Sequence, residues 1–351
     1  MQIKTTPNEK ILILGPAWVG DMVLAQSLFT TLKQQFPNCQ IDVAAPAWTL
    51  PLLERMPEVT NGIALPFKHG EFAFWKRINF GKSLRKASYT QAIILTNSFK
   101  SAILPFAANI PRRTSFLGEM RYGLINDIRS LDKRKLPRTI DRFVTLGLAK
   151  NTELPKIPNP KLSANHENAQ ATLKKTGYAM PSSKVLGLCP GAEYGEAKRW
   201  PIDYFAATAK FALDKGWEVW LFGSEKDVPY THLINQQVGN RCLDLGGKTK
   251  LGEAIDLMAL CDTIISNDSG LMHVAAALDK NLIAIFGSST PHHTPPMSSK
   301  AKIEYLGLSC SPCFKRVCPL KNENSHMQCL KKITPKSVID LINLDHSSVL
   351  L

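Results

Sequence analysis

Short apolar runs recur along the chain and alternate with longer stretches whose apolar residues follow a helical period. In chain order the runs are ILILG at 11–15, IDVAA at 41–45, QAIILT at 91–96, VLGLC at 185–189, EVWLFG at 218–223, DTIIS at 262–266 and LIAIFG at 282–287. Apolar strands bounded by turn residues and separated by helix-length segments are typical of parallel sheets covered on both faces. The pattern therefore predicts an α/β protein.

One segment, residues 151–170, interrupts this alternation. Its sequence, NTELPKIPNPKLSANHENAQ, contains three prolines and mostly polar residues, which predicts a linker. We therefore expect two doubly wound, Rossmann-like domains, residues 1–160 and 161–335. We also expect a C-terminal helix, residues 336–351, packing back toward the first domain. Ligands of such folds bind beyond the carboxyl ends of the strands, so the two domains should face each other across a cleft lined by strand-to-helix turns.

Composition and charge narrow the classes of partner. No apolar run approaches the roughly 18 residues of a membrane span, and the N-terminal MQIKTTPNEK lacks the apolar core of a secretory signal, so we expect a cytoplasmic protein. Residues 1–150 hold 21 Lys and Arg against 10 Asp and Glu, which accounts for most of the net charge of +14. This half is expected to meet an anionic lipid surface or a phosphorylated sugar, unless the protein is simply basic. Nucleic acid is not expected, because no zinc-finger spacing or RNA-binding strand motif is present.

Two turns of the second half carry candidate chemistry for a nucleotide. In CPGAEYGEAKRWP, residues 189–201, backbone N–H groups and the cation of Lys198 could bind a diphosphate before a helix that begins near Pro201. In LFGSEKD, residues 221–227, Glu225 could accept hydrogen bonds from ribose hydroxyls. The alternatives are a solvated lysine and an acidic helix cap.

A third turn lies within ISNDSGLMHVAAAL, residues 265–278, where polar residues lead directly into an Ala-rich helix. Free N–H groups and the helix dipole make this turn a candidate anion site. Asp268 could instead cap the helix, and His273 could belong to the core.

The stretch ILILGPAWVGDM, residues 11–22, ends a buried strand and begins a helix at Asp21. A carboxylate at a helix N-terminus stays ionised and can accept a proton from a bound hydroxyl, so Asp21 is a candidate general base. A simple N-cap role is the alternative.

Five blocks in this order resemble the inverting ADP-heptose:lipopolysaccharide heptosyltransferases over about residues 10–290. They are GPAWVGDM, NSFKSAILPF, RRTSFLGEMRYGLINDI, PGAEYGEAKRWP and SNDSGLMHVAAAL. The resemblance implies a GT-B fold with the acceptor on the first domain, an ADP-sugar on the second, and no metal or other cofactor in catalysis. It also implies a lipopolysaccharide inner-core acceptor and peripheral contact with the cytoplasmic membrane face, which would explain the basic first half.

Carried over to this sequence, the resemblance makes Asp21 the catalytic base. The residues it assigns to ADP-heptose are Ala192, Glu193, Lys198, Glu225, Asp268, Ser269, Gly270 and His273. On charge and location, the acceptor residues are expected to be Lys100, Arg112, Arg113 and Arg121. The wording NSFKSA and RYGLIND favours type II transfer onto the first heptose over transfer onto Kdo, and a noncatalytic nucleotide-binding or membrane-surface module remains a rival.

Four cysteines close to the C-terminus form a separate motif. They occur in CSPCFKRVCPLKNENSHMQC as Cys310, Cys313, Cys318 and Cys329. A C-x-x-C pair followed by two more thiols can suit a structural zinc ion. Free thiols and a redox-labile disulfide are the alternatives.

Overall fold

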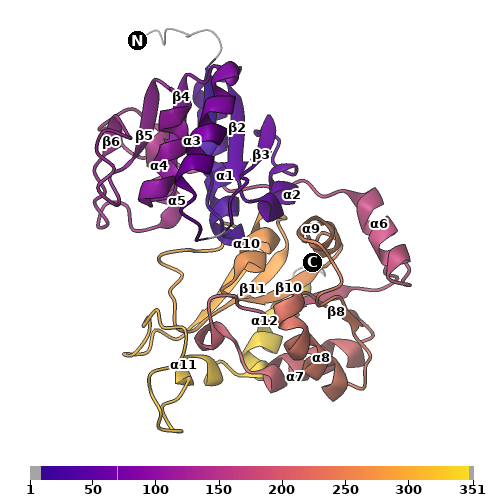
Figure 1. The fold of residues 1–351 in the computed structure, drawn as a ribbon. Coiled ribbons are helices and arrows are strands. Elements are labelled where there is room, and N and C mark those ends of the chain that lie inside the picture. Colours follow the sequence, from indigo (N-terminus) through magenta and orange to yellow (C-terminus); the bar gives the residue numbers. More distant parts are fainter. Residues whose placement is uncertain (1–8, 69, 348–351) are drawn as a thin grey trace. The chain divides into compact units, whose positions relative to one another are not determined.

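The apolar runs of the sequence form the central strands of two parallel sheets. The computed structural model describes residues 9–68 and 70–347, and the chain divides into two units at Pro160 (Figure 1). Each unit is built on one six-stranded sheet.

The sheet of the first unit has the order β3-β2-β1-β4-β5-β6, with every neighbouring pair parallel. Its strands are β1 (Lys10–Leu14), β2 (Gln40–Ala45), β3 (Asn61–Ala64), β4 (Gln91–Ile94), β5 (Arg112–Phe116) and β6 (Asp127–Arg129). Residues 11–14 of the central β1 are all buried because helices cover both faces.

Helices cover the first sheet in two pairs. They are α1 (Val19–Gln35), α2 (Leu50–Leu53), α3 (Phe74–Ser83), α4 (Phe99–Ala107) and α5 (Thr139–Gly147), with short 3-10 turns η1 (Ala47–Thr49) and η2 (Leu84–Ala87). α1 packs on α5, and α3 packs on α4. A Cβ on Gly81 of α3 would lie 2.6 Å from the carbonyl oxygen of Leu104, so glycine permits the close approach of α3 and α4.

The sheet of the second unit has the order β12-β11-β10-β7-β8-β9. Its strands are β7 (Val185–Cys189), β8 (Glu218–Leu221), β9 (Leu243–Asp244), β10 (Thr263–Asn267), β11 (Asn281–Phe286) and β12 (Ala301–Tyr305). Its helices are α6 (His166–Lys175), α7 (Ile202–Asp214), α8 (Val228–Gln237), α9 (Leu251–Met258), α10 (Gly270–Ala277), α11 (Gln328–Lys331) and α12 (Pro335–Ser347), with 3-10 turns η3 (Glu196–Lys198) and η4 (Glu225–Asp227).

The last helix belongs to the core of the second unit. Val338 and Ile342 of α12 are buried in the cluster formed with α7 and the sheet, and α12 lies beside α7 in Figure 1. Residues 348–351 of the expected C-terminal helix lie outside the described residues. Contact of this helix with the first domain stays a prediction.

All seven predicted apolar runs are strands, which confirms the α/β interpretation. The predicted linker is wrong at its end, because α6 already begins at His166 and Asn165 caps it by accepting a hydrogen bond from the backbone of Asn168 at 2.9 Å. Among the helices of the described residues, none combines the length and the apolar character that spanning a bilayer requires.

Candidate functional site

The loop from β7 to α7 carries Lys198 at the end of η3. The Nζ atom of Lys198 lies 2.6 Å from Oδ2 of Asp268, which directly follows β10. The Asp268 side chain is 5% exposed and that of Lys198 is 17% exposed, so this is a largely buried ion pair. Two turns separated by 70 residues in sequence therefore meet at the carboxyl end of the second sheet.

Asp268 does not act as the N-cap of α10. The N-cap residue is Ser269, whose side chain makes no capping bond, and Asp268 instead accepts hydrogen bonds from Lys198 and from the hydroxyl of Ser289. The first N–H groups of a helix, here from Gly270 onward, have no partner within the helix. Beside a lysine ammonium they form an environment suited to a phosphate.

Asn267 holds the two turns together. Its Oδ1 accepts a hydrogen bond from the backbone N–H of Trp200 at 3.0 Å, and its Nδ2 donates to the carbonyl of Pro190 at 2.7 Å. Sequence reasoning placed Asn267 in the turn without giving it a role. The available signal was a polar residue that ends an otherwise apolar strand.

His273 lies one turn into α10 and is buried. Burial lowers the pKa of its imidazole to about 4, although Asp268 opposes the shift and Lys198 adds to it. The ring is therefore neutral at pH 7. Among the described residues its Nδ1 has no hydrogen-bond partner, although the atom is fully enclosed.

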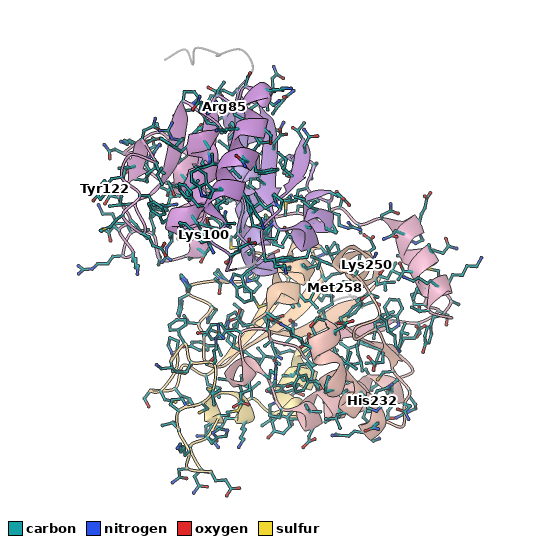
Figure 2. The ribbon with its side chains drawn as sticks, in the orientation of Figure 1. Arg85, Lys100, Tyr122, His232, Lys250 and Met258 are labelled. Carbon is teal, nitrogen blue, oxygen red and sulfur yellow. The ribbon has the colours of Figure 1, made fainter. Side chains whose placement is uncertain are left out.

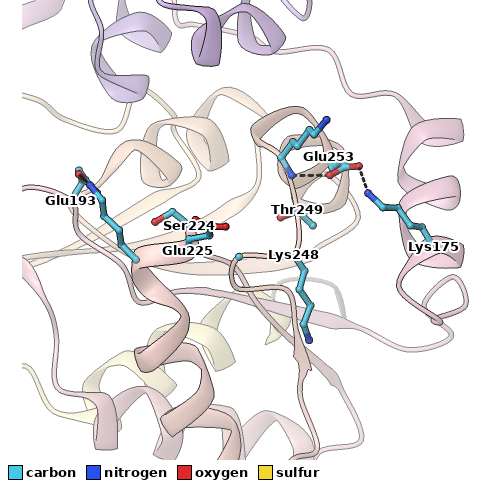
Figure 3. Close-up of a pocket in the computed structure, with 10 residues that line it drawn as sticks. Lys175, Glu193, Ser224, Glu225, Lys248, Thr249 and Glu253 are labelled. Atoms are coloured by element: carbon cyan, nitrogen blue, oxygen red, sulfur yellow. Dashed lines mark hydrogen bonds and ion pairs between the residues drawn. The ribbon is translucent and has the colours of Figure 1, made fainter. Parts of the chain in front are cut away.

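A pocket of about 630 Å³ lies at the carboxyl edge of the same sheet, along the turns that follow β7, β8 and β9 (Figure 3). Its lining residues are Lys175, Glu193, Ser224, Glu225, Lys226, Gly247, Lys248, Thr249, Lys250 and Glu253. Of the predicted donor residues, Glu193 and Glu225 are brought together here, and Glu193 forms an ion pair with Lys226. Sequence reasoning missed the loop 247–250, which follows a strand of only two residues.

The remaining donor residues support the turns. Ala192 is buried, and its carbonyl accepts a hydrogen bond from Nη2 of Arg199 at 3.4 Å. Ser269 and Gly270 lie where the polar turn joins α10.

The cysteine-bearing segment supports the Lys198 loop from outside. The hydroxyl of Tyr194 donates to the carbonyl of Phe314 at 2.7 Å, and the backbone N–H of Ala197 donates to the carbonyl of Arg316 at 3.0 Å. A Cβ on Gly195 would lie 2.4 Å from the Arg316 carbonyl oxygen, so this contact requires glycine.

The four cysteines of this segment are free thiols. Burial, followed by the neighbouring thiols, raises the pKa of Cys329 to about 11. Among the side chains that the structure describes, residues 9–68 and 70–342, no group of three His, Cys, Asp or Glu that could hold a metal ion is found. The zinc interpretation of Cys310, Cys313, Cys318 and Cys329 stays a prediction.

Asp21 lies in the first turn of α1 in the first unit, at the carboxyl end of β1. The helix begins at Val19 with Trp18 as its N-cap, so the alternative that Asp21 is the N-cap is wrong. Its half-buried carboxylate lies at the positive end of the dipole of a 17-residue helix.

The four predicted acceptor residues have different surroundings. Lys100 is half-buried in the first turn of α4, and Arg112 is exposed, donating from Nη2 to Oε1 of Gln91 at 2.5 Å. Arg113 donates to the carbonyls of Leu124 and Ile110, both at 2.6 Å.

Arg121 requires a correction. Its side chain is fully buried and donates to the carbonyls of Leu117, Thr96 and Phe116 and to the hydroxyls of Ser101 and Ser115. Burial lowers its pKa to about 10. A guanidinium with all its donors occupied inside the protein stabilises the loops and has none left for an acceptor sugar.

Similarity to known proteins identifies the family of this chain. Residues 77–323 match the sequence model of glycosyltransferase family 9 (heptosyltransferase). The chain belongs to glycosyltransferase family 9. This family 9 chain is 44% identical to lipopolysaccharide heptosyltransferase 2 of Salmonella typhimurium, over 94% of its own length and 97% of the relative's. It is 43% identical to lipooligosaccharide heptosyltransferase 2 of Haemophilus influenzae, over 95% and 98%.

Solved structures agree with the family. The structure of ADP-heptose lps heptosyltransferase II of E. coli superimposes with a TM-score of 0.84 at 41% identity, covering 95% of this family 9 chain and 98% of the other. The expected GT-B class, with two Rossmann-like α/β domains, is confirmed, and the chain is a glycosyltransferase.

Proposed function

We propose that this glycosyltransferase moves L-glycero-D-manno-heptose from ADP-heptose onto the first heptose of the lipopolysaccharide inner core, with inversion. The observation that carries the proposal is the Lys198–Asp268 pair at the N-terminus of α10, with a pocket large enough for a nucleoside at the same edge of the sheet. The relatives named as heptosyltransferase 2, and the E. coli structure named as an ADP-heptose lps heptosyltransferase II, support heptose transfer from ADP-heptose.

The donor is proposed to bind entirely on the second unit. Its diphosphate would accept hydrogen bonds from Lys198 and from the N–H groups that begin α10. Its ribose hydroxyls would donate to Glu225, which lines the 630 Å³ pocket. The neutral imidazole of His273 can donate one N–H to a phosphate oxygen without adding charge.

Asp21 is proposed as the general base. The acceptor hydroxyl gives its proton to the Asp21 carboxylate while its oxygen attacks the anomeric carbon of the heptose from the face opposite the diphosphate. The bond from the anomeric carbon to the diphosphate oxygen breaks, and ADP leaves with the electron pair. Lys198 and the α10 N–H groups stabilise the charge that develops on ADP, so we propose that no metal is required.

The acceptor also bears on where the protein works. Inner-core lipopolysaccharide is lipid-anchored, so we propose that the protein acts in the cytoplasm, in peripheral contact with the membrane. The excess of cations in residues 1–150 and the anionic character of the acceptor support this.

The experiment measures ADP release by the purified protein from ADP-heptose, with inner-core acceptors that carry or lack the first heptose and with EDTA present. Release only with the heptose-bearing acceptor is the expected result. Release only with the bare Kdo acceptor would move the protein to the type I reaction, and no release with either would favour a noncatalytic nucleotide-binding module.

Asp21→Asn tests the base. Loss of general-base catalysis is expected to lower kcat by about 10²–10⁴-fold, with ADP affinity unchanged because the donor residues lie on the other unit. Asp132→Asn, which changes an exposed carboxylate on a loop of the same unit, is the matched control and should retain full activity. Undiminished transfer by Asp21→Asn would remove Asp21 from the mechanism.

A further inference from the structure

Three large aromatic side chains are exposed together where the loop after β3 enters α3. Phe72 is 52% exposed, Phe74 39% and Trp75 72%. The rings of Phe72 and Phe74 are stacked with centroids 6.1 Å apart, and Phe74 meets Trp75 edge to face at 5.2 Å. We refer to Phe72, Phe74 and Trp75 as the aromatic cluster. Contiguous exposed apolar surface of this kind marks an interaction site in a folded protein.

The loop that carries the aromatic cluster is held in place from beneath. Arg77 is buried and donates to the carbonyls of Phe72 at 2.7 Å and Glu71 at 3.0 Å, and its guanidinium lies 4.2 Å from the ring centroid of Phe67. Ala73 adopts a left-handed conformation with φ of 46°, which is costly for a residue with a Cβ. The loop therefore has a defined conformation that holds the three rings at the surface.

The position of the aromatic cluster within the first unit is also informative. It follows the carboxyl end of β3, the same edge of the sheet at which Asp21 follows β1. The neighbouring helix α4 begins at this edge with Phe99, which is 38% exposed, and Lys100. The cluster thus borders the edge at which the acceptor is proposed to react.

Cations follow the aromatic cluster along α3. Between residues 68 and 87 the sequence has six Lys and Arg, of which Arg77 is buried, and a single acid, Glu71. On α3, the exposed Trp75 and Lys82 share one helical stripe, since they are spaced by seven residues. Figure 2 shows Arg85 and Lys100 at opposite ends of the first unit, so η2 lies at the far end of α3 from the aromatic cluster. Aromatic rings beside lysines and arginines match the interface of an anionic bilayer, where rings enter the headgroup region and cations meet the lipid phosphates.

We infer that the aromatic cluster and the exposed cations of α3, Lys76 and Lys82, dock the first unit on an anionic lipid bilayer. The inference rests on the proposed function, because a lipid-anchored acceptor must be presented to Asp21 from a membrane surface. It adds which surface makes the contact. Docking at the edge that carries Asp21 lets the sugars of an anchored acceptor reach the base while the acyl chains stay in the membrane.

The test measures co-sedimentation of the full chain with vesicles of phosphatidylethanolamine and phosphatidylglycerol, and with neutral phosphatidylcholine vesicles. The expected result is binding to the anionic vesicles that weakens with salt. The double variant F74S/W75S should lose about tenfold or more in vesicle partition. Lys82→Gln should lose about fivefold, because each cation near an anionic surface contributes about that factor. Trp75→Phe should keep binding but lose the fluorescence quenching by brominated lipids that a Trp in the headgroup region undergoes.

Matched controls come from the other unit. Tyr178→Ser removes an aromatic ring that is 48% exposed, and Lys174→Gln removes an exposed cation. Neither should change vesicle partition. Equal losses in the control and cluster variants, or wild-type binding to anionic vesicles by F74S/W75S, would overturn the inference.

ADP release with a deacylated, water-soluble acceptor separates this inference from the proposed function. F74S/W75S should match the wild-type protein in that assay and lose activity only with acceptor embedded in vesicles. If F74S/W75S raises the KM for the soluble acceptor, the rings contact sugar instead. If the wild-type protein binds RNA and F74S/W75S does not, the surface binds nucleic acid instead. If the wild-type protein binds vesicles normally but shows no turnover, the proposed function is contradicted and the docking surface is not.

Discussion

Lys198 has two roles at the residue scale, because the ammonium that would meet the diphosphate also neutralises Asp268. Removing it leaves a carboxylate that is 5% exposed without its cation. We predict that Lys198→Ala abolishes detectable ADP binding in isothermal titration calorimetry. We also predict that it lowers the free energy of unfolding by about 3 kcal/mol, as is typical when one partner of a buried ion pair is removed.

Two variants give this prediction its controls. Lys210→Ala breaks an exposed pair with Asp214 and should cost less than about 1 kcal/mol. The double variant K198A/D268N should recover part of the stability but none of the ADP affinity. Normal ADP binding by Lys198→Ala would contradict the donor site.

His273 predicts a particular dependence of stability on pH. Its pKa is about 4 in the folded protein and near 6.5 in an unfolded chain, so the unfolded state binds the proton more tightly. The stability that the neutral His273 ring contributes is fully present above pH 6.5. It is lost as the pH falls from 6.5 to 4, and the free energy of unfolding loses nothing more from this group below pH 4. The loss is up to about 3 kcal/mol. Urea unfolding of the wild type and His273→Gln between pH 4 and 7.5 measures it. The stability difference between the two proteins should change over this window, and parallel curves would contradict the assignment.

At the scale of elements, Arg121 joins the loops that follow β4 and β5. Its guanidinium donates six hydrogen bonds inside the first unit, and a lysine can reproduce the charge but not the planar set of donors. We predict that Arg121→Lys lowers the free energy of unfolding by about 3 kcal/mol. Arg112→Lys, at an exposed position of β5, should change it by less than about 1 kcal/mol. Chemical denaturation checks both, and a small effect of Arg121→Lys would return this residue to the acceptor candidates.

The strands that sequence analysis found are the central ones, and the strands it missed are mostly at the edges. β1, β4, β7 and β10 are buried on both faces, so each reads as a continuous apolar run. The edge strands β3, β6, β9 and β12 are short or mostly half-buried, and they carry no such signal. β5 was also missed, because RRTSF begins with two arginines and reads as polar.

The candidate site follows the same logic. Lys198, Glu225 and Asp268 could be found from sequence because each follows an apolar strand, where ligands of parallel sheets bind. Their partners could not, since the contact of Lys198 with Asp268 spans 70 residues. Charge alone could not separate Arg121 from Arg112, because only the packing decides whether a guanidinium faces solvent or carbonyls. The roles of the donor and acceptor residues stay predictions.

At the scale of the whole molecule, the two units should respond differently to the nucleotide. The proposed ADP site lies entirely on the second unit. The two units are joined by residues 152–165, which form neither helix nor strand. We predict two transitions in calorimetry of the full chain, of which only one moves to higher temperature with ADP. At 100 times Kd the stabilisation is about 2.7 kcal/mol. In Lys198→Ala neither transition should move, and an equal shift of both would contradict a site confined to one unit.

The segment that supports the Lys198 loop does so mainly through its backbone, although the guanidinium of Arg316 also lies 5.5 Å from the ring centroid of Tyr194. Phe314 and Arg316 offer carbonyl oxygens to Tyr194 and Ala197, and every residue type has that group. Selection at these two positions therefore acts on the path of the chain more than on the identity of the side chains. Substitutions there should accumulate during evolution without loss of the donor site, whereas an insertion or deletion of a single residue would displace both carbonyls and should be rare.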